Sequence, residues 1–477
     1  EPSREMMIHI SEKFKEKGIP APLRILTTYG GTVSPTHKQL ITTMMSGPIG
    51  GMIGTKFLAK EYGIQNLVSS DVGGTSFDVG LTMEKYVPTK WESSMGGFIL
   101  NIPMIALDSI GAGTGMFIRF NEVSGRLEFG PESAGYKIGV CNEDSGIENV
   151  TLTDCSLILG YLNPEYFLGG KVPLNKKRAY EYIEEQLAIP FKSDPYSTAR
   201  GAVDLVELHM KNHLNGMIQG LGFRPENYTL VSFGGGGPLH VAGYSRGLKF
   251  ENVLIPDWAA AFSAFGCACA EHSYHYEKSI DGVVTPDGRM NQAVSMLVNA
   301  TWADLKKKIV NEFKSEGRDP KEMIFKPSLR MQYLGMLDDL EVSWQSDMIQ
   351  PDDIWKIARK YDDLFEEIYR RGTKSPELGY HITKVVATGI VPVPRPRLPE
   401  HEEVGKEPEE NASKGTRDIY WLKNWHEASI WEMERIIPGN VIDGPAVIEA
   451  PATTLLVPPA YRVKLDKHRI YQMEVVK

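Results

Sequence analysis

Apolar residues recur along this chain with two different periods. In some segments they return every three or four residues, which predicts amphipathic helices. In others, short apolar runs border glycine or proline, or alternate with polar residues, which predicts strands. Because helices and strands follow one another along most of the chain, the pattern indicates an α/β fold. The expected helices cover residues 1–18, 197–219, 291–316 and 352–371, and the expected strands lie at residues 24–26, 67–68, 230–231, 253–256, 328–344 and within 420–477.

Two segments are rich in small residues and are expected to form closely packed helices. Residues 46–54 should open a helix with a nearly bare surface, which ends at Gly63. Residues 264–270 include Cys267 and Cys269, and in this apolar setting we interpret both cysteines as small packing residues, not as metal ligands. The longer helix over 197–219 is expected to bury Ala202, Leu205, Val206, Leu208, Met210, Leu214 and Met217.

Two glycine-rich loops are the main candidates for chemistry, and each follows a predicted strand. Glycine has no side chain to obstruct a ligand, so successive backbone N–H groups can cradle phosphate oxygens. A plain turn after a strand is the alternative for either loop alone, but the pair favours a nucleotide site. Neither loop has the Gly-Lys-Ser/Thr of a P-loop or the dinucleotide pattern. The expected ligands are Gly73, Gly74, Thr75 and Ser76 from the first loop and Gly234, Gly235, Gly236 and Gly237 from the second.

Carboxylates flank the first loop. Asp71 is the best candidate for a catalytic, Mg²⁺-binding or water-orienting group. Asp78 is a second catalytic candidate, which could instead cap a turn or pair with a lysine. Pro238 is expected to start a helix, and His240, in its first turn, is interpreted as a solvated or capping residue more readily than as an acid–base group.

Composition excludes several classes of function. The 477 residues carry a formal net charge of −9 without a long basic run, which argues against nucleic-acid binding. No apolar stretch reaches the length of a membrane span. Four cysteines in a chain of this length do not form a disulfide framework and fit a reducing cytoplasm.

The order of these features resembles the second half of an actin-like ATPase: a small-residue helix, the Asp71 loop, the Gly234 loop and a second small-residue helix. This resemblance implies an actin-like (ribonuclease H-like) ATPase lobe with an inserted mixed α/β region and a small C-terminal β-rich domain. It matches residues 71–76 to the second phosphate loop and residues 234–237 to the adenosine loop.

More specific motifs are similar to those of the hydantoinase A/oxoprolinase family. Within it, the chain looks most like the ATP-binding subunits of ketone carboxylases that act on acetone or acetophenone. Residues 138–143 depart from the Pro-Gly-Pro and Cys-Tyr-Gly pattern of ordinary hydantoinase A proteins. The motifs that carry the resemblance are residues 46–51, 71–79, 130–135, 153–154 and 233–238 for the family, and residues 136–141, 159–164, 261–267 and 375–380 for the branch.

The resemblance implies a function and its partners. ATP with Mg²⁺ would phosphorylate a small ketone's enolate, bicarbonate or both, and partner subunits, hydantoinase B-like and small, would complete a hetero-oligomeric carboxylase. A second metal such as Mn²⁺ or Zn²⁺ would belong to a partner. The alternatives are an ATP-dependent hydantoinase or 5-oxoprolinase that hydrolyses a cyclic amide, and an actin-like assembly protein.

The family's first phosphate loop, Asp-x-Gly-Gly-Thr, is not found before residue 71. We therefore expect the chain to be the C-terminal portion of a longer polypeptide. The expected division is the end of an N-terminal lobe at 1–40, the nucleotide-binding lobe at 41–80 and 201–280, the inserted region at 81–200, an α/β domain at 281–394, a linker at 395–417 and the β-rich domain at 418–477.

Overall fold

The computed structural model describes residues 2–83, 89–95, 98–105, 107–220, 222–337, 339–369 and 372–476. None of the helices in these ranges is both long and apolar enough to cross a bilayer. The chain forms two compact units, and each unit combines several of the segments that were expected from sequence. The expected domain boundaries stay a prediction. The first unit holds Glu1–Ile49, Trp91–Met104 and Ala270–Arg395, and the second holds Gly50–Lys90, Ile105–Cys269 and Pro396–Lys477.

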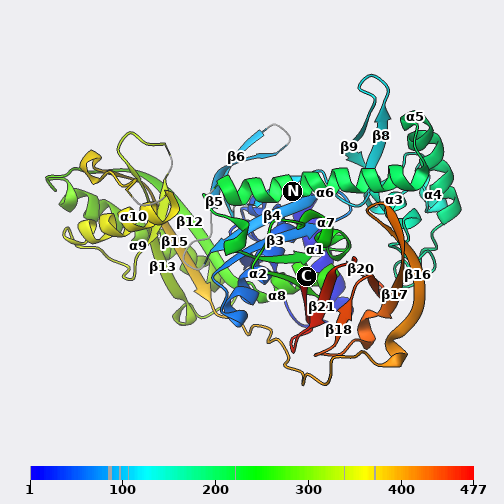
Figure 1. Cartoon of the computed structure of the whole chain (residues 1–477). Coiled ribbons are helices and arrows are strands. Elements are labelled where there is room, and N and C mark those ends of the chain that lie inside the picture. The colour runs from blue at the N-terminus through cyan, green and yellow to red at the C-terminus, as the bar shows by residue number, and fades with distance from the viewer. Residues whose placement is uncertain are drawn as a thin grey trace. The chain divides into compact units, whose positions relative to one another are not determined.

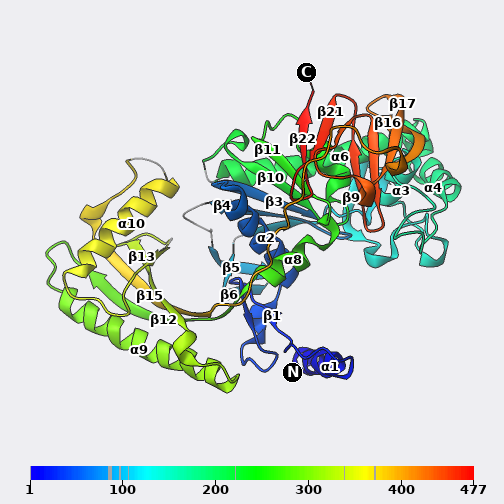
Figure 2. The ribbon, with the colours of Figure 1, turned by 90° about the horizontal axis from the view of Figure 1, so that it is seen from below.

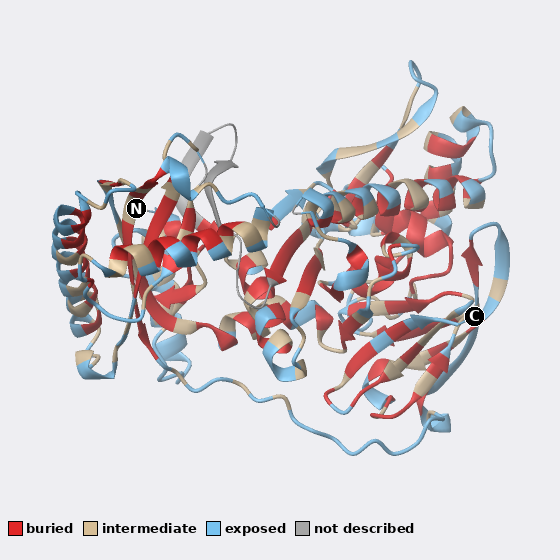
Figure 3. Cartoon of the chain, turned by 60° about the vertical axis from the view of Figure 1, so that its left-hand side comes forward, coloured by how far each residue is buried: buried red, intermediate tan, exposed pale blue. Residues whose placement is uncertain are grey.

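The second unit is built on an eight-stranded sheet of described strands, in the order β18-β21-β22-β11-β10-β3-β4-β7. Strands β3, β10 and β11 run parallel to one another, and the remaining neighbours pair antiparallel. The middle of the sheet is almost fully buried (Figures 1 and 3). The strands are β3 (Asn66–Val72), β4 (Phe77–Met83), β7 (Leu107–Ile110), β10 (Thr229–Phe233), β11 (Asn252–Pro256), β18 (Val441–Asp443), β21 (Tyr461–Leu465) and β22 (Ile470–Val475).

The C-terminal residues are rich in strands, as predicted, but they serve two sheets. Three of these strands extend the central sheet, where Met473 pairs with Val253. Four others form a second sheet (Figures 1 and 2): β16 (Ser413–Trp421), β17 (Asn424–Glu432), β19 (Ala446–Ala450) and β20 (Thr453–Val457).

The long helix α6 (Pro195–Gly220) occupies the predicted place. Its buried face includes Val203, Val206 and Met210, but Leu208 is 51% exposed, so that part of the prediction was wrong. At 100° per residue Leu208 lies opposite this face, and Glu207 is buried instead. The other helices and strands of this part of the chain are α3 (Leu152–Ile158), α4 (Lys176–Ile183), α5 (Ile189–Phe191), α7 (Gly237–Tyr244), β8 (Met116–Asn121) and β9 (Arg126–Ser133).

The two small-residue helices, α2 (Ser46–Tyr62) and α8 (Phe262–Cys269), pack backbone against backbone. A Cβ added to Gly266 would lie 1.7 Å from the Gly50 carbonyl oxygen, and one added to Gly50 would lie 2.3 Å from the Ser263 carbonyl oxygen. Glycine at these positions is therefore a packing requirement, which confirms the predicted close contact.

The first unit has its own sheet, whose described strands follow the order β1-β2-β12-β15-β13-β14. Helix α9 packs on β12 and β15, and α10 packs on β14. Helix α1 has no buried residue. The elements are α1 (Pro2–Glu16), β1 (Ile25–Leu26), β2 (Gly31–Val33), β12 (Glu271–Val284), α9 (Asn291–Ser315), β13 (Ile324–Tyr333), β14 (Leu340–Ser343), α10 (Asp353–Tyr369) and β15 (Tyr380–Val391); β5 (Thr89–Met95) and β6 (Phe98–Ile105) form a separate pair.

The contact between α2 and α8 predicts the stability of two glycine variants. Gly266→Ala should destabilise the protein by about 2–3 kcal/mol, because its methyl group must push two backbones apart. Gly201→Ala is the matched control, since an added Cβ on this exposed position of α6 meets nothing within 4 Å. It should be neutral or stabilising by up to about 1 kcal/mol. Thermal unfolding midpoints compare the two, and equal midpoints would contradict the contact.

Candidate functional site

The two glycine loops lie side by side because β3 and β10 are neighbouring parallel strands. Their register runs from Leu67 opposite Thr229 to Asp71 opposite Phe233, so both strands end at the same edge of the sheet. The Gly236 N–H donates to the Val72 carbonyl oxygen at 3.0 Å and ties the second loop to the end of the first strand. The carboxyl ends of parallel strands are where α/β folds bind ligands.

Two glycines of the second loop are required by the chain itself. Gly234 has a φ of +84°, and an added Cβ would lie 2.2 Å from an Asp71 carboxylate oxygen. A Cβ on Gly236 would lie 2.4 Å from the Thr114 methyl carbon. These positions are explained by local packing alone.

Gly73, Gly74 and Gly235 have no such explanation. None has a positive φ, and an added Cβ would meet no atom closer than 3.8, 3.4 and 3.6 Å respectively, which is ordinary contact. Gly74 and Thr75 are exposed, and their N–H groups make no backbone hydrogen bond to the described residues. Packing would accept a side chain at these three glycines. The absence of a side chain therefore leaves space that a ligand can occupy.

Asp71 and Asp78 face each other across the hairpin of β3 and β4, where they are directly paired. The Ser263 hydroxyl donates to Asp71 at 3.1 Å, and the Ser76 hydroxyl donates to Asp78 at 3.0 Å. Burial raises the pKa of Asp71 to about 6, opposed by the Ser263 bond and helped by the charge of Asp78. Burial also raises the pKa of Asp78. The site thus holds two close carboxylates in a setting that disfavours their charge.

A cavity of about 220 Å³ opens beside the loops, and Gly73, Gly74, Gly235 and Gly236 form one side of it. Its other walls come from α3, from residues 162–168, from α7 and from the turn between β19 and β20. The Thr453 hydroxyl donates to the Gly235 carbonyl oxygen at 3.0 Å and joins that turn to the second loop. Most of the wall is apolar: Leu162, Phe167, Leu168, Leu239, Ala450, Pro451 and Ala452.

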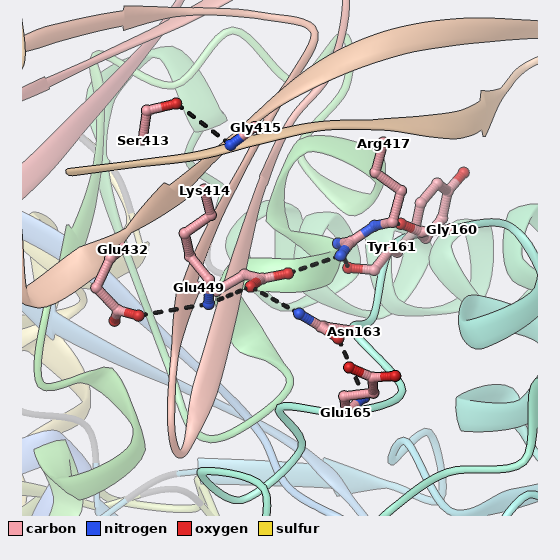
Figure 4. Close-up of polar contacts among 10 residues, drawn as sticks. All are labelled: Gly160, Tyr161, Asn163, Glu165, Ser413, Lys414, Gly415, Arg417, Glu432 and Glu449. Atoms are coloured by element: carbon pink, nitrogen blue, oxygen red, sulfur yellow. Dashed lines mark hydrogen bonds and ion pairs between the residues drawn. The ribbon is translucent and has the colours of Figure 1, made fainter. Parts of the chain in front are cut away.

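A buried carboxylate, Glu449, holds one wall in place (Figure 4). Lys414 and Arg417 pair with it at 2.6 and 2.8 Å, and the Asn163 amide donates to it at 3.2 Å. Burial raises the pKa of Glu449, but these partners outweigh that effect and hold it below its ordinary value. Arg417 also donates to the Gly160 carbonyl oxygen at 2.8 Å, so residues 160–163 are fastened to the C-terminal sheet.

Sequence reasoning misjudged His240. It is 1% exposed, so it is neither solvated nor a surface cap. Its Nδ1 lies 3.0 Å from a Glu207 carboxylate oxygen, and its ring lines the cavity. Glu207 lies 33 residues earlier on α6, and no local pattern joins the two residues.

The remaining candidate residues have structural roles. Asp154, from the motif at 153–154, accepts the N–H groups of Val140 and Cys141 and completes the capping box of α3 with the N-cap residue Thr151. None of the four cysteines, all of which the structure describes, is in a disulfide, and burial raises the pKa of Cys141, Cys155 and Cys267. Over the described residues, no three His, Cys, Asp or Glu side chains gather as a metal cluster would require.

The pKa of Asp71 predicts a change in stability with pH. Between its unfolded pKa near 4 and its folded pKa of about 6, only the folded chain keeps the proton, so stability falls as pH rises. Asp71→Asn removes this cost and should be more stable by about 3 kcal/mol at pH 8, with about half of the gain remaining at pH 5. Asp108→Asn, an exposed carboxylate on β7, is the control. Thermal midpoints from pH 5 to 8 test this, and a gain that does not change with pH would contradict it.

Comparison with known proteins gives the same family along the whole chain. The family model "Hydantoinase/oxoprolinase" matches residues 1–276, and "Hydantoinase/oxoprolinase C-terminal domain" matches residues 285–476. The chain is 42% identical over 480 residues to the acetone carboxylase beta subunit of Xanthobacter autotrophicus, covering 100% of this chain and 67% of that protein. It is 30% identical to the acetophenone carboxylase gamma subunit of Aromatoleum aromaticum, covering 98% and 64%.

A solved structure agrees with these matches. The nucleotide-free structure of acetone carboxylase superposes with a TM-score of 0.86 at 41% identity, covering 100% of this chain and 67% of that one. The chain therefore spans about two thirds of the length of these relatives. With family matches over both halves and the fold in agreement, this chain belongs to the hydantoinase/oxoprolinase family.

Proposed function

We propose that this chain is the ATP-binding part of a subunit of an ATP-dependent ketone carboxylase. ATP phosphorylates the enolate of a small ketone, bicarbonate or both, and a β-keto acid is the product of the complete enzyme. The similarity to acetone and acetophenone carboxylase subunits supports this reaction class. The observation that carries the proposal is the set of three glycines in two neighbouring loops, Gly73, Gly74 and Gly235, that packing does not require.

The roles of the loops follow from their donors. The exposed N–H groups of Gly74 and Thr75 hold phosphate oxygens, and the second loop, residues 234–237, lies along the adenosine. The Ser76 hydroxyl donates to Asp78. Its role is therefore to position that carboxylate more than to bind a phosphate. Phosphoryl transfer depends on such positioned donors more than on a special nucleophile.

Asp71 and Asp78 fit a Mg²⁺ site in which protein carboxylates and the phosphates of a nucleotide bind the same ion. Mg²⁺ takes one or two carboxylates and completes its shell with water and phosphate oxygens, so a pair of aspartates suffices. The raised pKa of both groups marks a place where a cation would relieve the cost of their charge. When bound, Mg²⁺ neutralises charge on the phosphates. We assign Asp71 as the metal ligand and Asp78 as the second carboxylate.

The complete enzyme has further subunits in this proposal. Hydantoinase B-like and small subunits form the carbon–carbon bond, and a second metal such as Mn²⁺ or Zn²⁺ belongs to one of them. The free thiols fit a cytoplasmic protein. Ring opening of 5-oxoproline, the alternative activity, would give an amino acid and not a β-keto acid. ATP hydrolysis by the complex with acetone, acetophenone and 5-oxoproline in turn separates these reactions.

Two variants test the nucleotide site. Gly74→Val fills the space that a phosphate must approach, and Asp71→Ala removes the metal ligand. Each should lower ketone-dependent ATP hydrolysis by at least about 100-fold, the scale of losing one preorganised contact to a transition state, while the complex still assembles. Gly201→Val and Asp352→Ala make the same changes at exposed positions away from the site. Near-normal turnover in both test variants would refute the assignment.

A third measurement tests the division of labour. The isolated chain should produce no β-keto acid from ketone, ATP and bicarbonate, because its proposed chemistry ends at phosphoryl transfer. The complex with its partner subunits should produce it under the same conditions. Mass spectrometry of the product, after trapping by reduction, distinguishes the two, and a β-keto acid made by the isolated chain would contradict this proposal.

A further inference from the structure

A chain of buried polar groups leads to the cavity beside the glycine loops. Arg200 lies 3.0 Å from one Glu207 oxygen, and His240 Nδ1 lies 3.0 Å from the other. All three residues are at most 4% exposed. Gly243 on α7 makes room for this arrangement, since an added Cβ would lie 1.9 Å from the Glu207 carboxylate. Glu207 is therefore fixed between a cation and an imidazole ring.

The hydrogen bond to Glu207 decides which ring nitrogen of His240 is basic. A carboxylate only accepts hydrogen bonds, so Nδ1 carries the hydrogen and Nε2 holds the lone pair. Nε2 is buried and has no hydrogen-bond partner among the described residues, although His240 lines the cavity. A buried nitrogen left without a partner is costly unless a ligand supplies one.

Ser156 on α3 is a second observation of the same kind. It is fully buried, its hydroxyl oxygen has no hydrogen-bond partner in the described structure, and it lines the same cavity. Among the described lining side chains, the cavity thus offers a basic nitrogen and a hydroxyl that are both buried without a partner, within largely apolar walls. That set fits a molecule with one polar group and an apolar body.

The volume of the cavity and the charges of its lining residues restrict the kind of ligand that it can bind. The cavity is smaller than the roughly 300–1,000 Å³ of pockets for drug-sized ligands. No lysine or arginine is among its lining residues, and the one lining carboxylate, Glu449, is already paired with Lys414 and Arg417. An anion such as bicarbonate would find no cation there, whereas a small neutral ketone would be accepted.

We propose that the cavity binds the ketone and that His240 is the general base that forms its enolate. This inference rests on the proposed function and deepens it. Nε2 takes a proton from the carbon beside the carbonyl, the C–H electron pair forms a C=C bond, and the carbonyl π pair moves to oxygen. The enolate oxygen then attacks the terminal phosphorus of ATP, and the nucleoside diphosphate leaves. The Ser156 hydroxyl donates to the carbonyl oxygen.

The neighbouring groups suit this step. Glu207 orients the ring and stabilises the imidazolium that forms, as carboxylates do behind histidine bases. Gly73 and Gly74 line the same cavity, so the enolate forms next to the proposed phosphate loop. Residues 162–168 and 449–454 form the largely apolar walls opposite the glycine loops.

The test uses the complete carboxylase assembled with His240→Asn, which retains a donor toward Glu207 but has no base at the Nε2 position. Ketone-dependent ATP turnover with acetone should fall by about 100-fold or more, within the range of general-base catalysis, while affinity for a fluorescent ATP analogue stays within threefold. Exchange of acetone hydrogens with D₂O should be lost with it. His209→Asn, on the same unit but outside the cavity, should leave the ATP turnover, the affinity for the ATP analogue and the exchange of acetone hydrogens unchanged. Imidazole should restore part of the turnover of His240→Ala.

Ser156→Ala provides a second readout that does not depend on the histidine. It should lower kcat/KM for acetone about five- to tenfold, because the lost hydrogen bond serves the carbonyl oxygen on which the enolate charge develops. Turnover of His240→Asn within threefold of His209→Asn, or an unchanged kcat/KM for acetone in Ser156→Ala, would overturn the inference while the proposed function stands. Loss of nucleotide affinity in His240→Asn with an unchanged KM for acetone would make the cavity a nucleoside pocket. Wild-type enzyme without ketone-dependent ATP turnover would refute the proposed function and this inference together.

Discussion

The parallel pairing of β3 with β10 is the constraint on which the site depends. The strands come from segments about 160 residues apart, yet their register ends both at the same sheet edge. The hydrogen bond from Gly236 to Val72 then fixes the spacing of the loops. A one-residue slip in this pairing would turn Asp71 to the other face and separate the carboxylate from Ser263. The rest of the second unit, from the α2–α8 contact to the C-terminal strands, surrounds that edge.

Glycine in these loops has two different physical meanings. At Gly234 and Gly236 the neighbouring atoms leave no room for a Cβ, so the fold alone accounts for the residue. At Gly73, Gly74 and Gly235 there is space for a Cβ, yet the residue is glycine. An unfolded chain loses more entropy when glycine is ordered than when alanine is, so a bare position without a packing reason costs stability. Ligand access is the benefit that offsets this cost in our proposal.

Local pattern was enough to predict the long helices and both loops, but it missed β12 and β15, the two long strands of the first unit. Helices such as α6 and α9 show their period directly, and a strand that ends in glycines needs no partner to be recognised. Leu208 was misplaced because an apolar residue on the exposed side of a helix looks like any other leucine. His240, Glu207, Ser156 and Glu449 could not be found as a group, since only tertiary packing brings them to one cavity. The use of C-terminal strands in the central sheet is likewise a long-range pairing without a local signal.

The buried polar groups of the second unit are better explained by the positions in which they hold the cavity walls than by a contribution to the free energy of unfolding. Removing charges from water costs several kcal/mol for each ion, and apolar residues of similar volume often stabilise a fold equally well. Glu449 nevertheless gathers Lys414, Arg417 and Asn163, and Glu207 gathers Arg200 and His240. Each carboxylate fixes one wall of the same cavity: Glu449 holds the segment after α3, and Glu207 holds the imidazole ring on α7. Because both are neutralised by their own partners, the cavity is bounded by charges without presenting a net charge to its occupant. Such walls suit a neutral molecule beside loops that are suited to phosphate, and an enolate needs this combination to be formed and captured.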